Sequence, residues 1–306
     1  MASNALREMS AMIRAAYAEN PAGEGDVEAM RARMEEQQGA FPLPEDVVRD
    51  DIDMAGVPGC RIQAPGVRDD RAVLYLHGGG YVMGSLDTHQ ELMGRISRQL
   101  KATVYGVDYR LAPEHPWPAA VDDAVAAWDW LRASGINSDQ AVVAGDSAGG
   151  GLCVALLMAL KEQGKPMPAG AVLFSPWTDL TGSGESVASR AEADPVIGPD
   201  MLKPLAAHYH ADNPADLPSV SPLFGDLTGL PPLLIQVGDA EILLDDSTRL
   251  HERAQAAGTS STLHVFEEAF HVFQVMPMLP EAAEALEEMA EFCERVVRQR
   301  RAAPGR

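Results

Sequence analysis

The pentapeptide Gly145-Asp146-Ser147-Ala148-Gly149 places a serine between two glycines, each two residues away. It follows the apolar run 141–144 and precedes a segment whose apolar residues have helical spacing. A tight strand-to-helix turn needs small flanking residues and pushes the serine hydroxyl out above the sheet edge. Ser147 is therefore the candidate nucleophile. A glycine-lined turn with a capping serine would have the same pattern, so the hypothesis depends on groups that could assist Ser147.

The run His77-Gly78-Gly79-Gly80 follows another apolar segment, 73–76. Consecutive glycines leave backbone N–H groups bare, so that they can point at an anion. The tetrahedral intermediate of acyl transfer carries an oxyanion, and each preorganised donor commonly contributes about 3 kcal/mol to its stabilisation. We expect the N–H groups of Gly78, Gly79 and Ala148 to form this oxyanion hole. A phosphate-binding loop is disfavoured because no Lys-Ser/Thr pair follows the glycines.

A serine hydroxyl needs a base to take its proton, and the base needs an acid that holds its tautomer. His271 follows the apolar segment 262–266 and is the candidate base, whereas other histidines lie in loops or element interiors that favour structural roles. The acid should lie after the segment 232–237. Four carboxylates compete there, and spacing alone does not choose among them: Asp239, Glu241, Asp245 and Asp246. The chain order serine, acid, histidine is typical of α/β hydrolases.

The elements that must position these residues follow from hydrophobic periodicity. Strand-length apolar runs alternate with helix-period segments, which predicts an α/β fold with a mainly parallel sheet and helices on both faces. The expected strands are 72–77, 103–108, 141–145, 170–174, 232–237 and 262–266, with weaker signals at 51–54 and 60–63. The clearest expected helices are 90–100, 118–133, 148–163, 245–257 and 280–300.

Two stretches do not join this alternation, and together they could form a helical cap. The expected organisation is residues 1–44 as the N-terminal part of the cap, 45–180 as the catalytic domain, 181–225 as a cap insertion, and 226–306 as the rest of the catalytic domain. Apolar cap residues could line an acyl pocket or pack in the core: Met9, Met12, Ile13, Met201 and Leu205.

Composition restricts the class of partner. The 306 residues include 24 Lys plus Arg and 45 Asp plus Glu, a formal net charge of −21, which disfavours binding to nucleic acid or to an anionic membrane surface. The three cysteines lack metal-ligand spacing. No secretory signal or bilayer-length apolar run is visible, so we expect a cytoplasmic protein.

Three blocks together resemble the hormone-sensitive-lipase-like branch, bacterial family IV, of the α/β-hydrolase esterases. They are His77-Gly78-Gly79-Gly80-Tyr81, Asp108-Tyr109-Arg110-Leu111-Ala112-Pro113-Glu114-His115 and Gly145-Asp146-Ser147-Ala148-Gly149-Gly150. In this family the acid usually opens an Asp-Pro-Leu-x-Asp segment, and that position here is Glu241. The resemblance thus implies the triad Ser147, Glu241 and His271, with Asp239 as the alternative acid. Val272 stands where the family usually has glycine, which puts the local backbone shape in doubt.

The resemblance also implies an eight-stranded sheet, a helical cap, and a carboxylesterase acting on short- to medium-chain acyl esters. It implies no metal or organic cofactor, a small-molecule ester as the substrate, and a possible homodimer. Two alternatives remain on the same fold: a non-catalytic protein that binds a small ligand, and an amide hydrolase.

Overall fold

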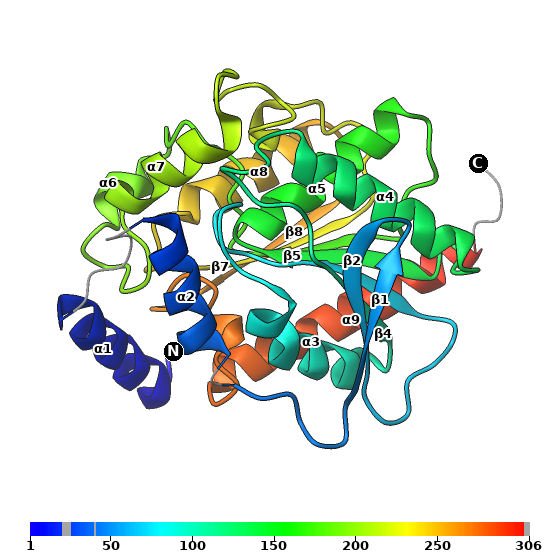
Figure 1. Ribbon diagram of the computed structural model, residues 1–306, viewed down its shortest axis with the longest axis horizontal. Helices are drawn as coiled ribbons and strands as arrows, with labels where there is room; N and C mark the ends of the chain where they lie inside the picture. Colours follow the sequence, from blue (N-terminus) through cyan, green and yellow to red (C-terminus); the bar gives the residue numbers. More distant parts are fainter. Residues whose placement is uncertain (20–25, 40, 303–306) are drawn as a thin grey trace.

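The computed structural model describes residues 1–19, 26–39 and 41–302, and its strands form one sheet in the order β1-β2-β4-β3-β5-β6-β7-β8 (Figure 1). The strands are β1 Val48–Met54, β2 Val57–Gln63, β3 Ala72–Leu76, β4 Thr103–Val107, β5 Ala141–Asp146, β6 Ala171–Phe174, β7 Leu233–Gly238 and β8 Ser261–Phe266. The pairs β1–β2 and β2–β4 are antiparallel, and the other neighbours are parallel. The predicted fold class and the eight-stranded sheet are confirmed.

Helices cover both faces of this sheet. They are α3 Leu86–Leu100, α4 Ala119–Ala133, α5 Ala148–Glu162, α8 Leu244–Ala256 and α9 Pro280–Ala302. In β3, Leu74 and Leu76 pack in a core with α4, α5 and α8, whereas Val73 and Tyr75 pack in a second core with α3 and α9. Because successive strand side chains point to opposite faces, a strand covered on both sides must be apolar throughout. This explains the unbroken apolar runs in the sequence.

Helix α3 begins four residues before the predicted start at Gln90. Ser85 caps it by accepting hydrogen bonds from the N–H groups of Asp87 and Thr88, and the Thr88 hydroxyl accepts one from the Ser85 N–H. This reciprocal capping box satisfies N–H groups that a helix end otherwise leaves unpaired. The apolar periodicity detects the middle of the helix but not this polar first turn.

The remaining helices are α1 Asn4–Glu19, α2 Val27–Gln38, α6 Ser186–Ser189 and α7 Pro199–His210, with two short 3-10 helices, η1 Pro222–Phe224 and η2 Phe273–Val275. Figure 1 shows α1, α2, α6 and α7 gathered at one end of the molecule. Leu6 of α1 is fully buried in a small core with Phe266, Phe270 and Phe273. Helix α1 is thus anchored beside the loop that carries His271.

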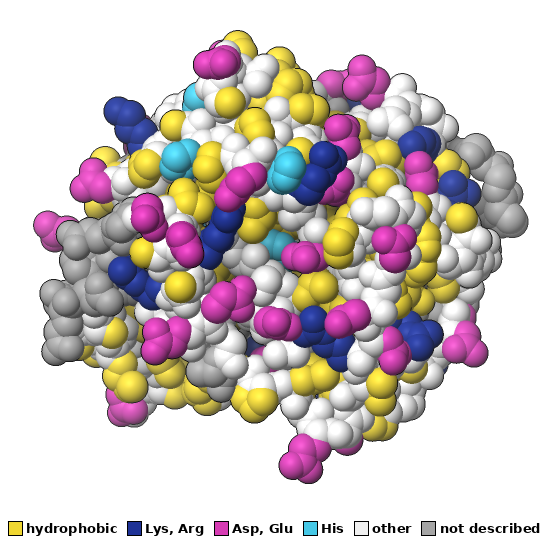
Figure 2. Space-filling model, viewed as in Figure 1, with side chains coloured by type: hydrophobic (Ala, Val, Ile, Leu, Met, Phe, Trp, Pro, Cys, Tyr) yellow, Lys and Arg dark blue, Asp and Glu magenta, His cyan; other side chains and the backbone are white. Residues whose placement is uncertain are grey.

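The described ranges contain no helix whose length and apolar composition would allow it to cross a bilayer. Figure 2 shows Asp and Glu side chains spread over the visible face, with Lys and Arg between them rather than in a basic patch.

Candidate active site

Ser147 lies between the last residue of β5 and the first residue of α5, with φ 52° and ψ −121°. This left-handed φ is unusual for a residue with a side chain and fits the sharp turn predicted for the pentapeptide. The turn is also tightly packed, because a Cβ atom on Gly149 would lie 2.0 Å from the Leu76 carbonyl oxygen. A Cβ on Gly145 would lie 2.5 Å from the Gly149 oxygen. The two glycines are therefore steric requirements of the turn.

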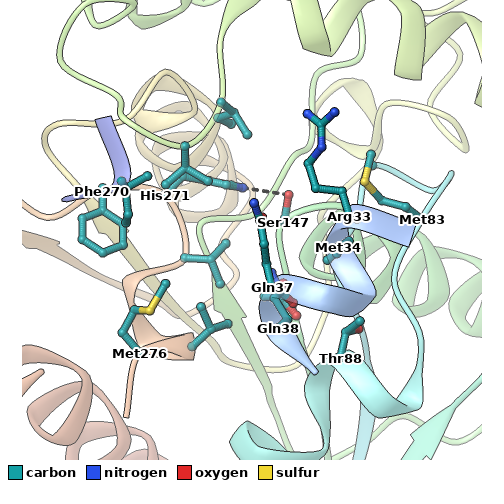
Figure 3. A pocket seen from close by; sticks show the side chains of 18 of the residues that line it. Arg33, Met34, Gln37, Gln38, Met83, Thr88, Ser147, Phe270, His271 and Met276 are labelled. Atoms are coloured by element: carbon teal, nitrogen blue, oxygen red, sulfur yellow. Dashed lines mark hydrogen bonds between the residues drawn. The ribbon is translucent and has the colours of Figure 1, made fainter. Parts of the chain in front are cut away.

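The structure brings Ser147, His271 and Glu241 together in one line of polar contacts. The His271 Nε2 atom lies 2.9 Å from Ser147 Oγ, and its Nδ1 atom lies 2.6 Å from Glu241 Oε2 (Figure 3 shows the first contact). Glu241 is fully buried and His271 is 6% exposed. With its proton on Nδ1, the imidazole donates to Glu241 and presents Nε2 as an acceptor to the Ser147 hydroxyl.

The Glu241 carboxylate is held by more than the histidine. Its Oε1 atom accepts hydrogen bonds from the Ser175 hydroxyl and from the Gly238 N–H, both at 2.7 Å. In the part of the chain that the structure describes, no hydrogen bond joins Asp239, the alternative acid, to His271; its Oδ1 atom instead accepts one from the Glu268 N–H at 2.7 Å. The geometry therefore places Glu241 beside the histidine and gives Asp239 a backbone partner.

Val272 has φ 52° and ψ 43°, a left-handed conformation that is rare for a β-branched residue. Its N–H donates to the Ser175 hydroxyl at 3.2 Å. Ser175 thus joins the backbone after His271 to the carboxylate of Glu241. Val272 therefore has a backbone conformation that is typical of glycine, and the hydrogen bond to Ser175 holds it there.

The Gly78–Gly80 loop differs from the prediction in its first residue. The Gly78 N–H donates to Asp146 Oδ1 at 3.0 Å, so this donor is used inside the fold. The expectation that Gly78 supplies an oxyanion donor is therefore corrected. Gly79 and Gly80 line the cavity in which Ser147 lies. Among the described residues, the N–H groups of Gly79, Gly80 and Ala148 have no hydrogen-bond acceptor.

Asp146 is the centre of a buried polar cluster that the sequence did not reveal. Besides Gly78, it accepts a hydrogen bond from the Tyr75 hydroxyl at 2.7 Å, and His89 Nε2 lies 3.4 Å from its carboxylate. His77 is also buried and its Nδ1 atom lies 2.8 Å from the Gly78 oxygen. Burial, reinforced by nearby His89, lowers the pKa of His77 to about 4, so this imidazole is neutral at neutral pH. The sequence signal for this cluster is an acidic residue, Asp146, at the end of the buried strand β5.

The pKa of His271 is raised above its ordinary value. Burial alone lowers this pKa, but the hydrogen bond and the charge of Glu241 raise it, and the charges of Asp194 and Asp146 add to that effect. The site thus stabilises the protonated imidazole. This is the form that a base adopts after it has taken the proton of a serine.

A cavity of about 550 Å³ opens beside Ser147 and His271. All five cap residues suggested by the sequence line it: Met9, Met12, Ile13, Met201 and Leu205. Eight of the 14 methionines of the chain line it: Met9, Met12, Met30, Met34, Met83, Met201, Met276 and Met278. Figure 3 shows that α2 contributes Arg33, Met34, Gln37 and Gln38 beside the serine. Flexible thioether side chains adapt to ligands of different shape, so this wall is apolar and deformable.

Known proteins share this arrangement of elements. A family model described as the alpha/beta hydrolase fold matches residues 73–275. The chain is 42% identical to an acetyl-hydrolase of Streptomyces hygroscopicus, over 81% of this chain and 83% of that protein. It is 43% identical to an esterase from the bacterial hormone-sensitive lipase family, whose crystal structure matches 97% of this chain and 100% of its own at a TM-score of 0.93. The crystal structure of EstE5 soaked with p-nitrophenyl butyrate matches at 42% identity and a TM-score of 0.92, over 97% of this chain and 99% of that chain.

Proposed function

This chain belongs to the hormone-sensitive-lipase-like esterases of the α/β-hydrolase superfamily, and we propose that it is a carboxylesterase that hydrolyses short- to medium-chain acyl esters through Ser147, His271 and Glu241. One observation carries the proposal: a single imidazole lies 2.9 Å from a serine hydroxyl and 2.6 Å from a buried carboxylate. That geometry is what proton transfer from serine to histidine requires.

In the first half of the reaction, His271 Nε2 takes the proton of Ser147 while Oγ attacks the ester carbonyl carbon. The carbonyl π electrons move to oxygen, which becomes the oxyanion of a tetrahedral intermediate. As this intermediate collapses, the alcohol leaves with the proton that His271 returns to it. An acyl-enzyme on Ser147 remains.

In the second half, His271 takes a proton from water, and the resulting hydroxide attacks the acyl carbon. Collapse of the second tetrahedral intermediate releases the acid and returns the proton to Ser147. Throughout the reaction Glu241 accepts the Nδ1 hydrogen bond of His271, and its charge stabilises the imidazolium. Side chains and backbone groups of the chain supply every catalytic function in this scheme.

The oxyanion needs N–H donors that no other group uses. Gly79, Gly80 and Ala148 meet this requirement, since the first two line the cavity and Ala148 follows the nucleophile at the N-terminus of α5. The helix dipole of α5 also favours negative charge at that end. We therefore assign the oxyanion hole to Gly79, Gly80 and Ala148 in place of the set that began with Gly78.

The short- to medium-chain preference is supported by the size and the composition of the cavity. A volume of about 550 Å³ is typical of sites for small ligands, and methionine and leucine side chains form most of its apolar wall. The acetyl-hydrolase name of one relative and the p-nitrophenyl butyrate soak of another are compatible with substrates of this class.

The test is the initial rate of hydrolysis of p-nitrophenyl acyl esters from acetate to palmitate, with wild type and Ser147→Ala measured side by side. We expect a maximum at short or medium chains and a loss of at least about 10⁴-fold in kcat for the variant. Retained turnover in a folded Ser147→Ala protein would refute the assignment of the nucleophile. A folded wild type without ester turnover would favour the ligand-binding alternative, and turnover of a matched amide alone would favour an amide hydrolase.

A further inference from the structure

Asp194 is a buried carboxylate outside the proposed triad, in the segment between β6 and α7. It is 7% exposed, and both of its oxygens accept hydrogen bonds from backbone N–H groups. Its Oδ1 atom accepts from Val196 at 2.9 Å and from Ile197 at 3.2 Å. Its Oδ2 atom accepts from Ile242 at 3.0 Å. The partners of the two oxygens belong to different parts of the chain.

These two groups of partners have different places in the site. Val196 and Ile197 line the cavity beside Ser147, whereas Ile242 directly follows Glu241. One side chain therefore ties a wall of the cavity to the loop that carries the proposed acid. A second side chain of the segment between β6 and α7 supports this link, because the Ser186 hydroxyl donates to the Ile242 carbonyl oxygen at 2.7 Å. Glu241 itself is bound by Ser175, Gly238 and His271.

Helix α1 holds the same segment from its other side. The Arg14 guanidinium donates to the carbonyl oxygens of Glu192 at 2.6 Å and of Ala193 at 2.5 Å. These are the two residues that precede Asp194. The segment is thus fixed between an N-terminal helix and the loop of Glu241.

The charge of Asp194 also acts on His271. Three carboxylates raise the pKa of the imidazole: Glu241 by a hydrogen bond and by charge, and Asp194 and Asp146 by charge. Burial, with a contribution from the charge of Glu241, raises the pKa of Asp194 itself to about 6, and His271 opposes that rise. Asp194 is therefore mainly ionised at pH 7 to 8, and its negative charge then acts on His271.

We propose that Asp194 is a positioning residue for the reaction: its carboxylate holds the cavity wall and the Glu241 loop in one arrangement, and its charge favours the imidazolium that forms on His271 during acyl transfer. This inference rests on the proposed function, since it assigns Asp194 a role through the same triad. A positioning role differs from a purely structural role, because a carboxylate that only stabilised the fold would not affect the titration of His271.

The experiment compares wild type, Asp194→Asn and Asp194→Ser with p-nitrophenyl butyrate as substrate, from pH 5 to pH 9. The asparagine keeps the size of the side chain and removes its charge, and the serine keeps a short acceptor for the local N–H groups. For both variants we expect kcat to fall about 10-fold or more. We expect the acid limb of the kcat/KM profile to move to lower pH by about half a unit, because a carboxylate that favours imidazolium has been lost.

Asp123→Asn is the matched control. Asp123 is also a buried aspartate that accepts a backbone N–H, that of Arg110, but it lies on α4 and pairs with the Arg110 guanidinium at 2.8 Å. This variant should lose thermal stability and keep the wild-type acid limb. Titration of His271 by NMR gives its pKa in each variant even when turnover is too slow to measure.

The results separate the inference from the proposed function. Turnover by Ser147→Ala would remove the proposed function whatever the Asp194 variants do. If Ser147→Ala is inactive, a lowered His271 pKa together with a lowered kcat in Asp194→Asn supports the positioning role. An unchanged kcat, or an unchanged His271 pKa, in a folded Asp194 variant would overturn it and leave Asp194 as a structural residue.

Discussion

The carboxylate of Asp146 accepts a hydrogen bond from the Gly78 N–H at 3.0 Å, so the residue that precedes the proposed nucleophile, Ser147, holds the start of the glycine loop. The bond joins the end of β5 to the loop after β3, two neighbouring parallel strands. The proposed nucleophile and two of the proposed oxyanion donors, Gly79 and Gly80, come from separate parts of the chain, and this contact links those parts.

Replacement of Asp146 by alanine should therefore reduce kcat more than it changes KM. The substitution leaves the buried Gly78 N–H and Tyr75 hydroxyl without an acceptor, at a cost of about 1–3 kcal/mol each, and frees the loop to shift. We expect kcat to fall about 100-fold in steady-state assays. Tyr75→Phe is the control, because it removes one hydrogen bond to Asp146 and keeps the one to Gly78. Equal losses of kcat in the two variants would contradict the role given to the loop contact.

The two candidate acids should respond very differently to neutralisation. Glu241→Gln removes the charge that faces His271 Nδ1, and we expect kcat to fall by about 10³-fold or more, since the amide can stabilise the wrong tautomer. Asp239→Asn keeps a side-chain oxygen that can accept from the Glu268 N–H and removes only the charge, so it should change kcat by less than about 3-fold. Steady-state kinetics of the two variants test this assignment. A larger loss of kcat in Asp239→Asn than in Glu241→Gln would make Asp239 the acid that assists His271.

Activity should depend on pH through the neutral form of His271. Glu241 raises the pKa of His271 above the ordinary imidazole value of about 6.5. On acidification, His271 therefore becomes protonated, and is lost as a base, at a pH above that value. The acid limb of kcat/KM should accordingly lie above about pH 6.5 and should move down in Glu241→Gln, if residual activity allows its measurement. A wild-type limb well below pH 6.5 would be inconsistent with His271 as the base.

Gly149→Ala should destabilise the protein and reduce its activity. The added methyl group would lie 2.0 Å from the Leu76 oxygen and 2.5 Å from the His77 oxygen, and backbone atoms cannot move aside cheaply. We expect a loss of about 1–3 kcal/mol or more in the free energy of unfolding, measured by urea denaturation. Gly198→Ala is the control, since Gly198 has an extended φ of −128° and open space around it. Similar stability of the two variants would contradict the packing described for the turn.

Met201→Trp should shift the substrate preference toward shorter acyl chains. Met201 lines the cavity from α7, and a larger side chain there reduces the space available to the ester. We expect the ratio of kcat/KM for acetate over octanoate esters to rise about 10-fold. Lys203→Trp places the same side chain on an exposed position of α7 and should leave the ratio unchanged. A ratio that is the same in Met201→Trp and wild type would mean that this wall does not contact the substrate.

Much of this protein could be predicted from local sequence patterns. The apolar runs identified every strand with a parallel neighbour to within one or two residues. The signal is clearest for β3, β5, β6 and β7, because a strand buried on both faces has few polar positions. The small residues around Ser147 and the run of glycines marked the two turns, because only such residues allow their backbone shapes. Glu241 and His271 followed from chain order and resemblance, and they lie in contact in the folded chain.

The tertiary structure decided how distant segments share their polar groups. Only the folded chain shows that the Gly78 N–H is occupied by Asp146, 68 residues away, and that Gly80 faces the cavity. Asp194 reaches the Ile242 N–H across 48 residues of sequence, and neither residue belongs to a local motif. The physical reason is that turns and periodicity depend on a few neighbouring residues, whereas a buried polar group takes whichever partner the packed chain brings within about 3 Å.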